Sequence, residues 1–314
     1  MPENQTRTNL QKNLSVLITG GSGLIGRYLT STLLTAGYEV SHLSRNNNQI
    51  EKVRVFFWDP EKRLIDEEAF EGIDFIIHLA GANIGEKRWT EKRKKEIIES
   101  RTDSARFLYE TIVDKGIPLK AFISASASGI YGAYTTEKIF TEQDPPAEDF
   151  LGSVCKKWEE SADLFNNSGV RTVKIRTGVV LEKSDSALSK LMQPGKFGFL
   201  IQAGTGFQYM PWIHIKDLCS IYLKAVEDST MSGAYNAVAP QHVTHREFMH
   251  VLAGVMKLKV LPMPVPGFIL RAVLGEMSDV ILKGSRVSSE KIMKTGYRFQ
   301  FSSLEDALIN VIGG

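Results

Sequence analysis

The chain has 314 residues, of which 43% are hydrophobic and 24% are charged, and its formal net charge is +2. A chain of this length buries a sizeable core, and so small a net charge gives no strong attraction to nucleic acid or to an anionic membrane. We therefore expect a small-molecule substrate, and neither nucleic acid nor a membrane as a partner. Nothing in the sequence indicates an oligomeric state.

The two cysteines and the polar N-terminus indicate the compartment. Cys155 and Cys219 form no C-x-x-C pair and have no pair of histidines nearby, so we expect no metal site and a reducing compartment. No apolar run precedes Leu14, and none elsewhere is long enough for a membrane-spanning helix. We interpret residues 1–12 as a flexible leader and expect a cytoplasmic protein without a secretory signal.

The elements predicted in chain order alternate between strands and helices. A short apolar strand at residues 14–19 is followed by a glycine cluster and by an amphipathic helix over 24–36. Further strands are predicted at 39–43, 53–58, 75–80, 121–124 and 172–175, with helices over 91–113 and 154–165. This succession predicts an α/β fold with a doubly wound, Rossmann-type parallel sheet.

Beyond about residue 181 the pattern changes, because prolines and glycines break the chain into loops. We therefore expect an NADP-binding Rossmann domain at residues 13–180 and a smaller C-terminal substrate lobe at 181–314. Part of that lobe, at about 205–240, is expected to return to the Rossmann domain.

A glycine-rich turn joins the first predicted strand to the first predicted helix, with glycines at positions 20, 23 and 26. Glycines in this context allow a tight turn, let the backbone approach a pyrophosphate, and leave helical N–H groups facing the anion. The alternative is a connection that holds no ligand. The residues that we expect to bind a dinucleotide are Gly20, Gly21, Ser22, Gly23, Leu24, Ile25 and Gly26.

The end of the second strand distinguishes between the two nicotinamide cofactors. An acidic residue there would bind the ribose 2′-hydroxyl and repel a 2′-phosphate, but the sequence reads Leu43-Ser44-Arg45. A guanidinium paired with the phosphate, helped by the Ser44 hydroxyl, favours NADP(H) as the cofactor. Alternatively, Arg45 is a solvated loop residue.

The ends of the next two strands supply further candidates. Asp59 stands before a proline, and we expect it either to reach the adenine edge or to form a turn. His78 ends an apolar strand and is followed by the segment Leu79-Ala80-Gly81, against which a cofactor can lie. We place Leu79, Ala80 and Gly81 in the cofactor site and interpret His78 as a core histidine.

Short strings distributed over nearly the whole chain carry a family resemblance. After the glycine turn they are His78-Leu79-Ala80-Gly81-Ala82-Asn83-Ile84, Arg88-Trp89-Thr90, Ser124-Ala125-Ser126-Ala127, Tyr131-Gly132, Trp158-Glu159, Trp212-Ile213-His214 and Gly275-Glu276-Met277. In this order they resemble the extended short-chain dehydrogenase/reductase superfamily. More specifically, the chain resembles an atypical, NAD-dependent epimerase/dehydratase-like subfamily with its own C-terminal domain.

The resemblance implies a serine that orients the substrate oxygen, a tyrosine that transfers the proton, and a lysine that lowers the tyrosine pKa. Ser126 matches the serine, since it follows a strand and precedes Tyr131-Gly132. The helix that should begin with Y-x-x-x-K has no tyrosine, and its lysine position falls on Cys155, Lys156 or Lys157. The catalytic candidates are Ser126, Tyr131 and Lys156, with Tyr131 either a substitute proton donor or a packing aromatic.

Two functions from different classes are consistent with this pattern. The first is an NADP(H)-dependent oxidoreductase acting on a small carbonyl or alcohol, with the proton supplied by Tyr131, Lys156 or water. The second is an NADP(H)-binding regulatory or scaffold protein that has lost its catalytic set. A nucleotide-sugar epimerase is disfavoured, because Met210 stands where the resemblance places a phosphate-binding arginine.

Overall fold

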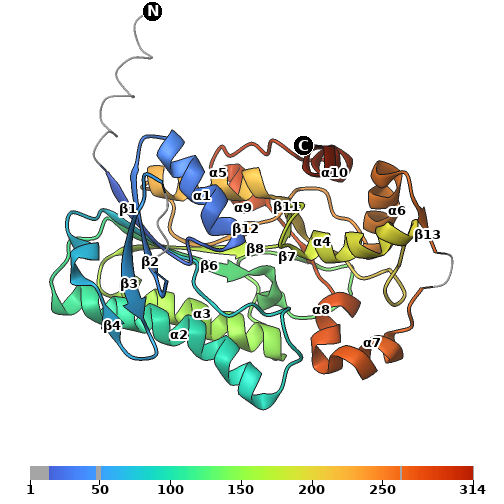
Figure 1. Cartoon of the computed structure of the whole chain (residues 1–314), viewed down its shortest axis with the longest axis horizontal. Helices are drawn as coiled ribbons and strands as arrows, with labels where there is room; N and C mark the ends of the chain where they lie inside the picture. Colours follow the sequence, from blue (N-terminus) through green and yellow to red (C-terminus); the bar gives the residue numbers. More distant parts are fainter. Residues whose placement is uncertain (1–13, 47–50, 262–263, 314) are drawn as a thin grey trace, which may run out of the picture.

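The computed structural model describes residues 14–46, 51–261 and 264–313 (Figure 1). The leader expected at residues 1–12 lies outside this described part.

An eight-stranded sheet forms the centre of the molecule, with the strand order β12-β8-β6-β5-β1-β2-β3-β4. Its neighbours pair in parallel, except that β4 is antiparallel to β3. The strands are β1 (Ser15–Thr19), β2 (Glu39–Ser44), β3 (Arg54–Asp59), β4 (Leu64–Ile65), β5 (Phe75–His78), β6 (Ala121–Ala127), β8 (Arg171–Thr177) and β12 (Gly233–Ala237). The order of the strands reverses between β1 and β5, which confirms the doubly wound, Rossmann-type α/β fold.

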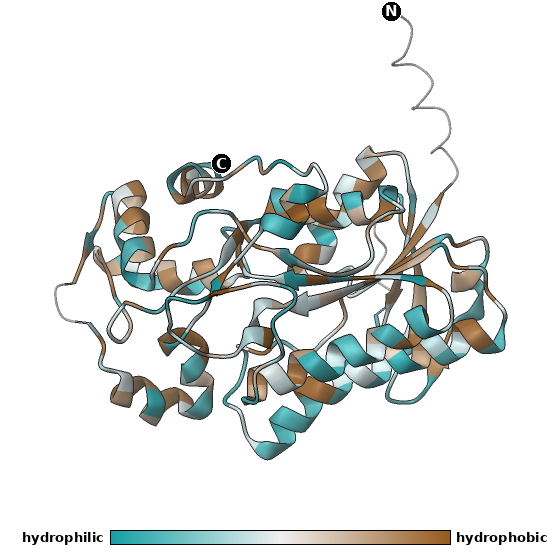
Figure 2. Ribbon diagram, turned by 180° about the vertical axis from the view of Figure 1, so that it is seen from behind, coloured by the Kyte–Doolittle hydropathy of each residue, from teal (hydrophilic) through white to brown (hydrophobic). Residues whose placement is uncertain are grey.

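Helices cover both faces of this sheet (Figure 1). On one face lie α1 (Leu24–Thr35) and α5 (Ile215–Glu227), which pack against each other, and on the other lie α2 (Glu91–Asp114) and α3 (Phe150–Asn167). Figure 2 shows that the first half of α2, far from the sheet, is largely hydrophilic. The large sheet thus has a layer of helices on each of its faces.

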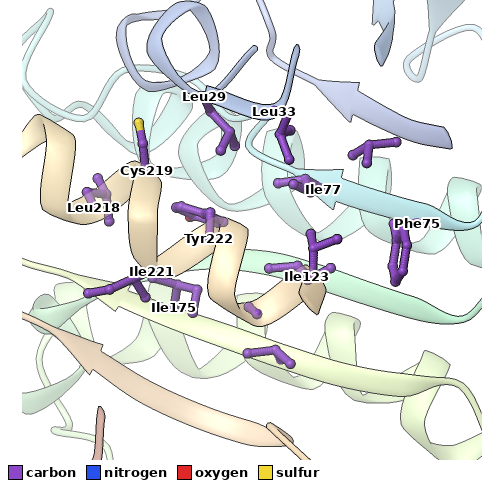
Figure 3. Packing of buried hydrophobic residues seen from close by; sticks show 14 of the residues in the cluster. Leu29, Leu33, Phe75, Ile77, Ile123, Ile175, Leu218, Cys219, Ile221 and Tyr222 are labelled. Atoms are coloured by element: carbon purple, nitrogen blue, oxygen red, sulfur yellow. The ribbon is translucent and has the colours of Figure 1, made fainter. Parts of the chain in front are cut away.

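Strand β1 shows why helices must cover both faces of the sheet. All five residues of β1 are buried, and successive side chains of a strand point to opposite faces. Ile18 packs in the cluster that contains Leu29 of α1 and Tyr222 of α5 (Figure 3). Leu17 belongs to a second cluster, which contains Phe122 of β6 and Phe165 of α3.

A smaller lobe is built around a third apolar cluster, which includes Leu200, Trp212, Phe248, Leu252 and Leu308. Its elements are β9 (Val179–Leu181), α4 (Ala187–Met192), β10 (Phe199–Leu200), β11 (Trp212–His214), α6 (His245–Met256), β13 (Lys259–Val260), α7 (Gly267–Leu274), α8 (Asp279–Leu282) and α10 (Leu304–Gly313). Two short elements link the lobe to the sheet layer: β14 (Arg286–Val287), which pairs with β7 (Ile139–Phe140), and α9 (Glu290–Lys294), which packs against β12.

The chain also crosses from this lobe back to the large sheet. After β11, helix α5 packs against α1, and β12 then adds to the edge of the sheet beside β8. Residues 215–237 thus belong to the sheet layer, although they follow elements of the smaller lobe in sequence.

Candidate functional site

The candidate site lies at the carboxyl ends of β1, β2 and β5, where the strand order reverses. Open α/β sheets bind their ligands in the crevice at this point. Helix α1 begins directly after β1, and its N-cap, Gly23, contributes no side-chain hydrogen bond to the helix. The first N–H groups of α1 are therefore free of side-chain capping and can bind an anion.

The geometry of the turn explains its glycines. Gly20 has a φ of +72°, which favours glycine, and its carbonyl accepts a hydrogen bond from the Gly23 N–H at 3.0 Å. A Cβ on Gly26 would lie 2.5 Å from the Gly20 carbonyl oxygen, and one on Gly21 would lie 2.4 Å from the His42 ring. The turn therefore excludes side chains at these positions and keeps the backbone accessible, which fits a dinucleotide pyrophosphate.

The remaining predicted residues of the turn flank this backbone. Ser22 is exposed, whereas Leu24 and Ile25 are half-buried on the first turn of α1. Arg27 donates to the Ser22 carbonyl at 3.1 Å and thereby helps to fix the turn.

The end of β2 carries the two residues predicted to select NADP(H). Ser44 is half-buried, and its Oγ accepts a hydrogen bond from the Asn46 N–H at 3.1 Å. Arg45 is exposed and precedes residues 47–50, which lie outside the described part. The structure therefore places both side chains at the carboxyl edge of the sheet, on the β2 side of the turn.

Asp59 ends β3 and forms the turn that follows it. Its Oδ1 accepts a hydrogen bond from the Lys62 N–H at 3.3 Å, and its Oδ2 lies 3.3 Å from the Lys62 ammonium. Of the two interpretations of Asp59, the structure bears out the turn-forming one, and contact with an adenine stays a prediction.

The segment after β5 lies against the glycine turn. The Thr19 carbonyl and hydroxyl accept hydrogen bonds from the N–H groups of Leu79 and Ala80, at 3.1 and 3.2 Å, and a Cβ on Gly20 would lie 3.0 Å from the Ala80 nitrogen. Gly81 follows and packs against the Arg101 side chain. Leu79, Ala80 and Gly81 thus continue the backbone surface formed by the turn.

His78, at the end of β5, has partners for both ring nitrogens. Nδ1 lies 2.8 Å from the Thr19 hydroxyl and Nε2 lies 3.1 Å from the Ser104 hydroxyl. Burial lowers the pKa of His78 to about 4, so the ring is neutral near pH 7. Its interpretation as a core histidine is confirmed.

Ser126 and Tyr131 belong to one buried network, with exposed fractions of 3% and 1%. The Ser126 hydroxyl donates to Glu159 Oε1 at 2.7 Å. Arg176 binds the same carboxylate through Nε and Nη2, at 2.7 and 2.9 Å, and donates through Nη1 to the Tyr131 hydroxyl at 2.9 Å. Tyr131 in turn donates to Asn236 Oδ1 at 2.7 Å.

This network holds the proton of the tyrosine in place. Burial raises the pKa of Tyr131 to about 12, although the Arg176 guanidinium beside it acts in the opposite direction. Sequence reasoning did not assign Glu159, Arg176 or Asn236 to the site. Glu159 belongs to the string Trp158-Glu159, which carries part of the family resemblance. However, no sequence pattern connects Glu159 with Arg176 of β8 or with Asn236 of β12.

Lys156 is not brought together with Ser126 and Tyr131. Its side chain is 60% exposed on the outer side of α3, and its ammonium lies 3.9 Å from Glu160. The neighbouring Cys155 is buried and faces the core instead. Of the three residues at which the lysine of Y-x-x-x-K could fall, Cys155 alone is buried, whereas Lys156 and Lys157 are exposed. Burial raises the pKa of the Cys155 thiol to about 12.

Two family models match the chain. The NAD dependent epimerase/dehydratase family matches residues 16–152, which include the glycine turn and Ser126. A domain of unknown function, DUF1731, matches residues 265–311. The epimerase family protein YfhF of Bacillus subtilis is 38% identical over 302 residues, which make up 95% of this chain and 98% of that protein. The chain belongs to this epimerase family.

Two solved structures extend the comparison. The human epimerase family protein SDR39U1, isoform 2, crystallised with NADPH, matches with a TM-score of 0.84 and 30% identity over 96% of this chain and 100% of that one. A nucleoside-diphosphate sugar epimerase from Corynebacterium glutamicum matches with a TM-score of 0.78 and 31% identity, over 98% of this chain and 60% of that one. The resemblance to atypical extended short-chain dehydrogenases is confirmed.

In this epimerase family member, the C-terminal domain is fastened to the sheet layer through Asp217 of α5. The buried carboxylate accepts hydrogen bonds from the Tyr297 hydroxyl and from the N–H groups of Gln300 and Phe301, at 2.8, 2.8 and 3.0 Å. Burial raises the pKa of Asp217. Asp217 thus fixes the position of the segment that leads into α10.

Met210 lies just before β11, at the junction of the two lobes. It is half-buried, packs against the apolar cluster of the smaller lobe, and donates its N–H to the Val243 carbonyl at 2.9 Å. Its thioether carries no charge and offers no hydrogen-bond donor to a phosphate.

Over residues 14–46, 51–261 and 264–313, no group of three or more His, Cys, Asp or Glu side chains is placed to hold a metal ion. Nor does any helix in the same ranges have the length and apolar character needed to cross a membrane.

Proposed function

We propose that the chain binds NADP(H), with the pyrophosphate on the turn from Gly20 to Gly26 and the 2′-phosphate beside Ser44 and Arg45. The observation that carries this proposal is the shape of the turn, whose backbone stays bare because a Cβ at Gly26 would lie 2.5 Å from the Gly20 carbonyl oxygen. The uncapped start of α1 adds N–H groups for the anion. The structure of the human relative SDR39U1 with NADPH supports the proposal of the same cofactor for this chain.

A titration followed by intrinsic fluorescence tests this proposal. NADPH should bind more tightly than NADH, and Arg45→Ala should remove most of that preference because the 2′-phosphate loses its guanidinium. Arg106→Ala, which removes an exposed arginine of α2, is the matched control and should change neither affinity. Equal affinity for the two cofactors in the unmodified protein, or no loss in Arg45→Ala, would contradict the assignment.

We propose further that the protein is an oxidoreductase acting on a small carbonyl or alcohol. When bound, the nicotinamide cofactor supplies or accepts the hydride. Ser126 and Tyr131 lie in one network at the end of β6, in which Glu159 and Arg176 hold their hydroxyl groups in place. These hydroxyl groups are assigned the role of orienting the substrate oxygen. The proton is assigned to Tyr131 or to water rather than to Lys156, because the Lys156 ammonium points away from this network.

A second candidate function is that of an NADP(H)-binding regulatory or scaffold protein. The observation that favours it is the commitment of both hydroxyl protons inside the protein, that of Ser126 to Glu159 and that of Tyr131 to Asn236. In addition, neither lysine near the start of α3 is buried, since Lys156 and Lys157 are exposed and Cys155 takes the buried position beside them. A protein of this kind binds the cofactor but does not catalyse its oxidation or reduction.

Turnover distinguishes the two candidates. An oxidoreductase should oxidise NADPH with some member of a panel of small aldehydes and ketones, and Ser126→Ala and Tyr131→Phe should each lower kcat at unchanged NADPH affinity. A regulatory protein binds NADPH with the same affinity and oxidises it with no member of the panel. Activity that survives both substitutions would remove Ser126 and Tyr131 from the proposal.

Nucleotide-sugar epimerisation is a weaker candidate despite the names of the relatives. Met210 stands at the junction where a phosphate-binding arginine would be required, and a thioether cannot neutralise a diphosphate. Calorimetric titration with UDP-glucose checks this point. We expect no binding at millimolar concentration, and micromolar affinity would restore the epimerase interpretation.

A further inference from the structure

Residues 88–90 and 275–277, which form two of the strings that carry the family resemblance, meet between the two lobes although they lie far apart in the sequence. A Cβ on Gly275 would lie 2.8 Å from Nε of Arg88, so the guanidinium occupies space that the glycine leaves open. The segment 82–90 directly follows the residues placed at the cofactor. It therefore runs from the proposed cofactor edge to the smaller lobe.

Trp89 connects this junction with the end of β6. Its ring centre stands 4.8 Å from that of Phe150, at the start of α3. Leu151 packs in the same apolar cluster, and a Cβ on Gly129 would lie 3.6 Å from the Leu151 Cβ. Gly129 follows the strand end that carries Ser126. Through α3, the segment that bears Arg88 is thus packed against the end of β6, where the substrate oxygen is proposed to lie.

Arg88 is a cation that neither of the two meeting segments neutralises. It is exposed, and it forms no ion pair with any residue that the structure describes. The acidic side chain of its own segment, Glu86, lies 3.1 Å from the guanidinium of Arg93. The acidic side chain across the junction, Glu276, lies 2.6 Å from the ammonium of Lys94. The positive charge of Arg88 is therefore available to a ligand.

A second cation reaches the same segment from the smaller lobe. Lys190, in the last turn of α4, is exposed and donates to the Gly85 carbonyl at 2.8 Å. Like Arg88, it has no carboxylate partner within residues 14–46, 51–261 and 264–313. Two unpaired cations thus lie along the segment 82–90, and like charges gathered at a cleft raise the local concentration of an anionic ligand.

We propose that Arg88, assisted by Lys190, binds a carboxylate of the substrate, so that the preferred carbonyl or alcohol is an oxo acid or a hydroxy acid; this inference rests on the function proposed above. A guanidinium presents paired donors that match the two oxygens of a carboxylate, whereas an ammonium acts as a point charge. The uncharged Met210 leaves the smaller lobe without the arginine that a nucleotide diphosphate would need, so a substrate with a single small anionic group fits best.

Binding is measured first, because it requires no turnover. Terminally trifluorinated butanoate and the corresponding neutral butanol are titrated by fluorine NMR, with the NADPH-saturated protein and with the protein alone. The variants are Arg88→Met, Arg88→Lys and Lys190→Met. The matched controls are Arg106→Met and Lys196→Met, which remove exposed cations from α2 and from the loop after α4. Thermal unfolding verifies that each variant is folded, and Arg88→Lys provides a milder change if Arg88→Met is not.

The unmodified protein should bind the butanoate on the order of tenfold more tightly than the butanol, and Arg88→Met should remove most of this preference. Arg88→Lys should keep part of it, since it retains the charge but loses the paired donors. Lys190→Met should weaken the butanoate about threefold, as expected for an exposed charge. The two control variants should bind both ligands as the unmodified protein does.

Turnover is measured with a pair of aldehydes that differ in the same way. NADPH oxidation with succinic semialdehyde should have a kcat/KM on the order of tenfold higher than oxidation with butanal. Arg88→Met should lower this ratio by raising KM for the semialdehyde, because the carboxylate binds in the ground state and in the transition state alike.

Three results would overturn the inference. Equal binding of the butanoate and the butanol by the unmodified protein would exclude a carboxylate site, whether or not the protein turns over. Equal weakening of both ligands in Arg88→Met would make Arg88 a residue that only holds the junction of the lobes. An equal loss of butanoate binding in Arg106→Met would reduce the effect to general electrostatics. By contrast, butanoate binding that depends on Arg88 without oxidation of NADPH by either aldehyde would support the carboxylate site and contradict the proposed oxidoreductase.

Discussion

Ser126 donates its hydroxyl proton to Glu159 at a distance of 2.7 Å, although one residue ends a strand and the other lies on a helix 33 positions later. Arg176 donates two hydrogen bonds to the same carboxylate, from Nε at 2.7 Å and from Nη2 at 2.9 Å. Bidentate pairs of this kind are strong and geometrically specific. The ion pair therefore sets the orientation of Ser126, and through Arg176 it also sets that of Tyr131.

Glu159→Gln should destabilise the fold, because it leaves the Arg176 guanidinium buried without a counter-charge. Breaking one side of a buried pair costs about 3–5 kcal/mol, which urea unfolding followed by circular dichroism can measure. Glu160→Gln makes the same substitution one residue later, where the side chain is 59% exposed, and should cost less than about 0.5 kcal/mol. A similar small loss in both variants would show that the buried pair contributes little.

Gly26→Ala should disturb both cofactor binding and stability. The new Cβ would lie 2.5 Å from the Gly20 carbonyl oxygen and 2.6 Å from Gly21 atoms. These are backbone atoms, so they cannot relieve the clash by a side-chain rotation. We expect NADPH affinity to fall at least tenfold, as the turn must open to admit the methyl group.

Gly254→Ala is the matched control for that substitution. Gly254 lies inside α6, and an added Cβ meets nothing within 4 Å. Alanine there should raise the free energy of unfolding by about 0.5–1 kcal/mol, since it favours the helix more than glycine does. If Gly26→Ala binds NADPH normally, the glycine turn is not the pyrophosphate site.

The cofactor edge could be predicted from sequence because its signals are local. The glycines from 20 to 26 stand between a strand and a helix, and the order of those elements determines where the turn lies in the sheet. The register of α3 was less clear, since three neighbouring residues competed for the lysine position. The apolar spacing of Val154, Trp158 and Phe165 does predict the buried face of α3, on which Cys155 lies and Lys156 does not.

The network around Ser126 could not be predicted in the same way. Glu159 and Arg176 are ordinary charged residues in the sequence, and only the packing of α3 against β8 brings them together. Asn236 is even farther from Ser126 in the sequence, because it lies on β12, which follows elements of the smaller lobe. Contacts between distant segments of this kind leave no periodic pattern in a single sequence.

Asp217→Asn should loosen the C-terminal domain. The carboxylate accepts hydrogen bonds from Tyr297, Gln300 and Phe301, and an amide would turn an N–H toward at least one of these donors. An unsatisfied buried group costs about 1–3 kcal/mol. Hydrogen exchange should therefore become faster at residues 297–301 before it does in the large sheet. The exposed Asp306→Asn in α10 serves as control, and protection that stays equal in the two variants would contradict the role of Asp217.

The pH dependence of stability should follow the buried histidines. Burial lowers the pKa values of His42, His78, His214 and His245 to about 4 in the folded protein, whereas an unfolded histidine has a pKa of about 6.5. Between these two values the unfolded chain binds more protons than the folded one. Acidification from about pH 6.5 toward pH 4 therefore favours unfolding, and the stability that the neutral rings contribute is lost over that window.

His42 allows this relationship to be tested at one residue. Its Nε2 lies 2.8 Å from the Thr30 hydroxyl, which already donates its own proton to the Gly26 carbonyl, so the neutral ring must donate from Nε2. His42→Gln keeps a donor and removes the titration. Urea midpoints measured at about pH 7 and pH 5 should therefore differ less in this variant than in the unmodified protein. His250→Gln replaces an exposed histidine and should keep the full difference. If His42→Gln keeps it as well, His42 is not among the groups that make the fold sensitive to acid.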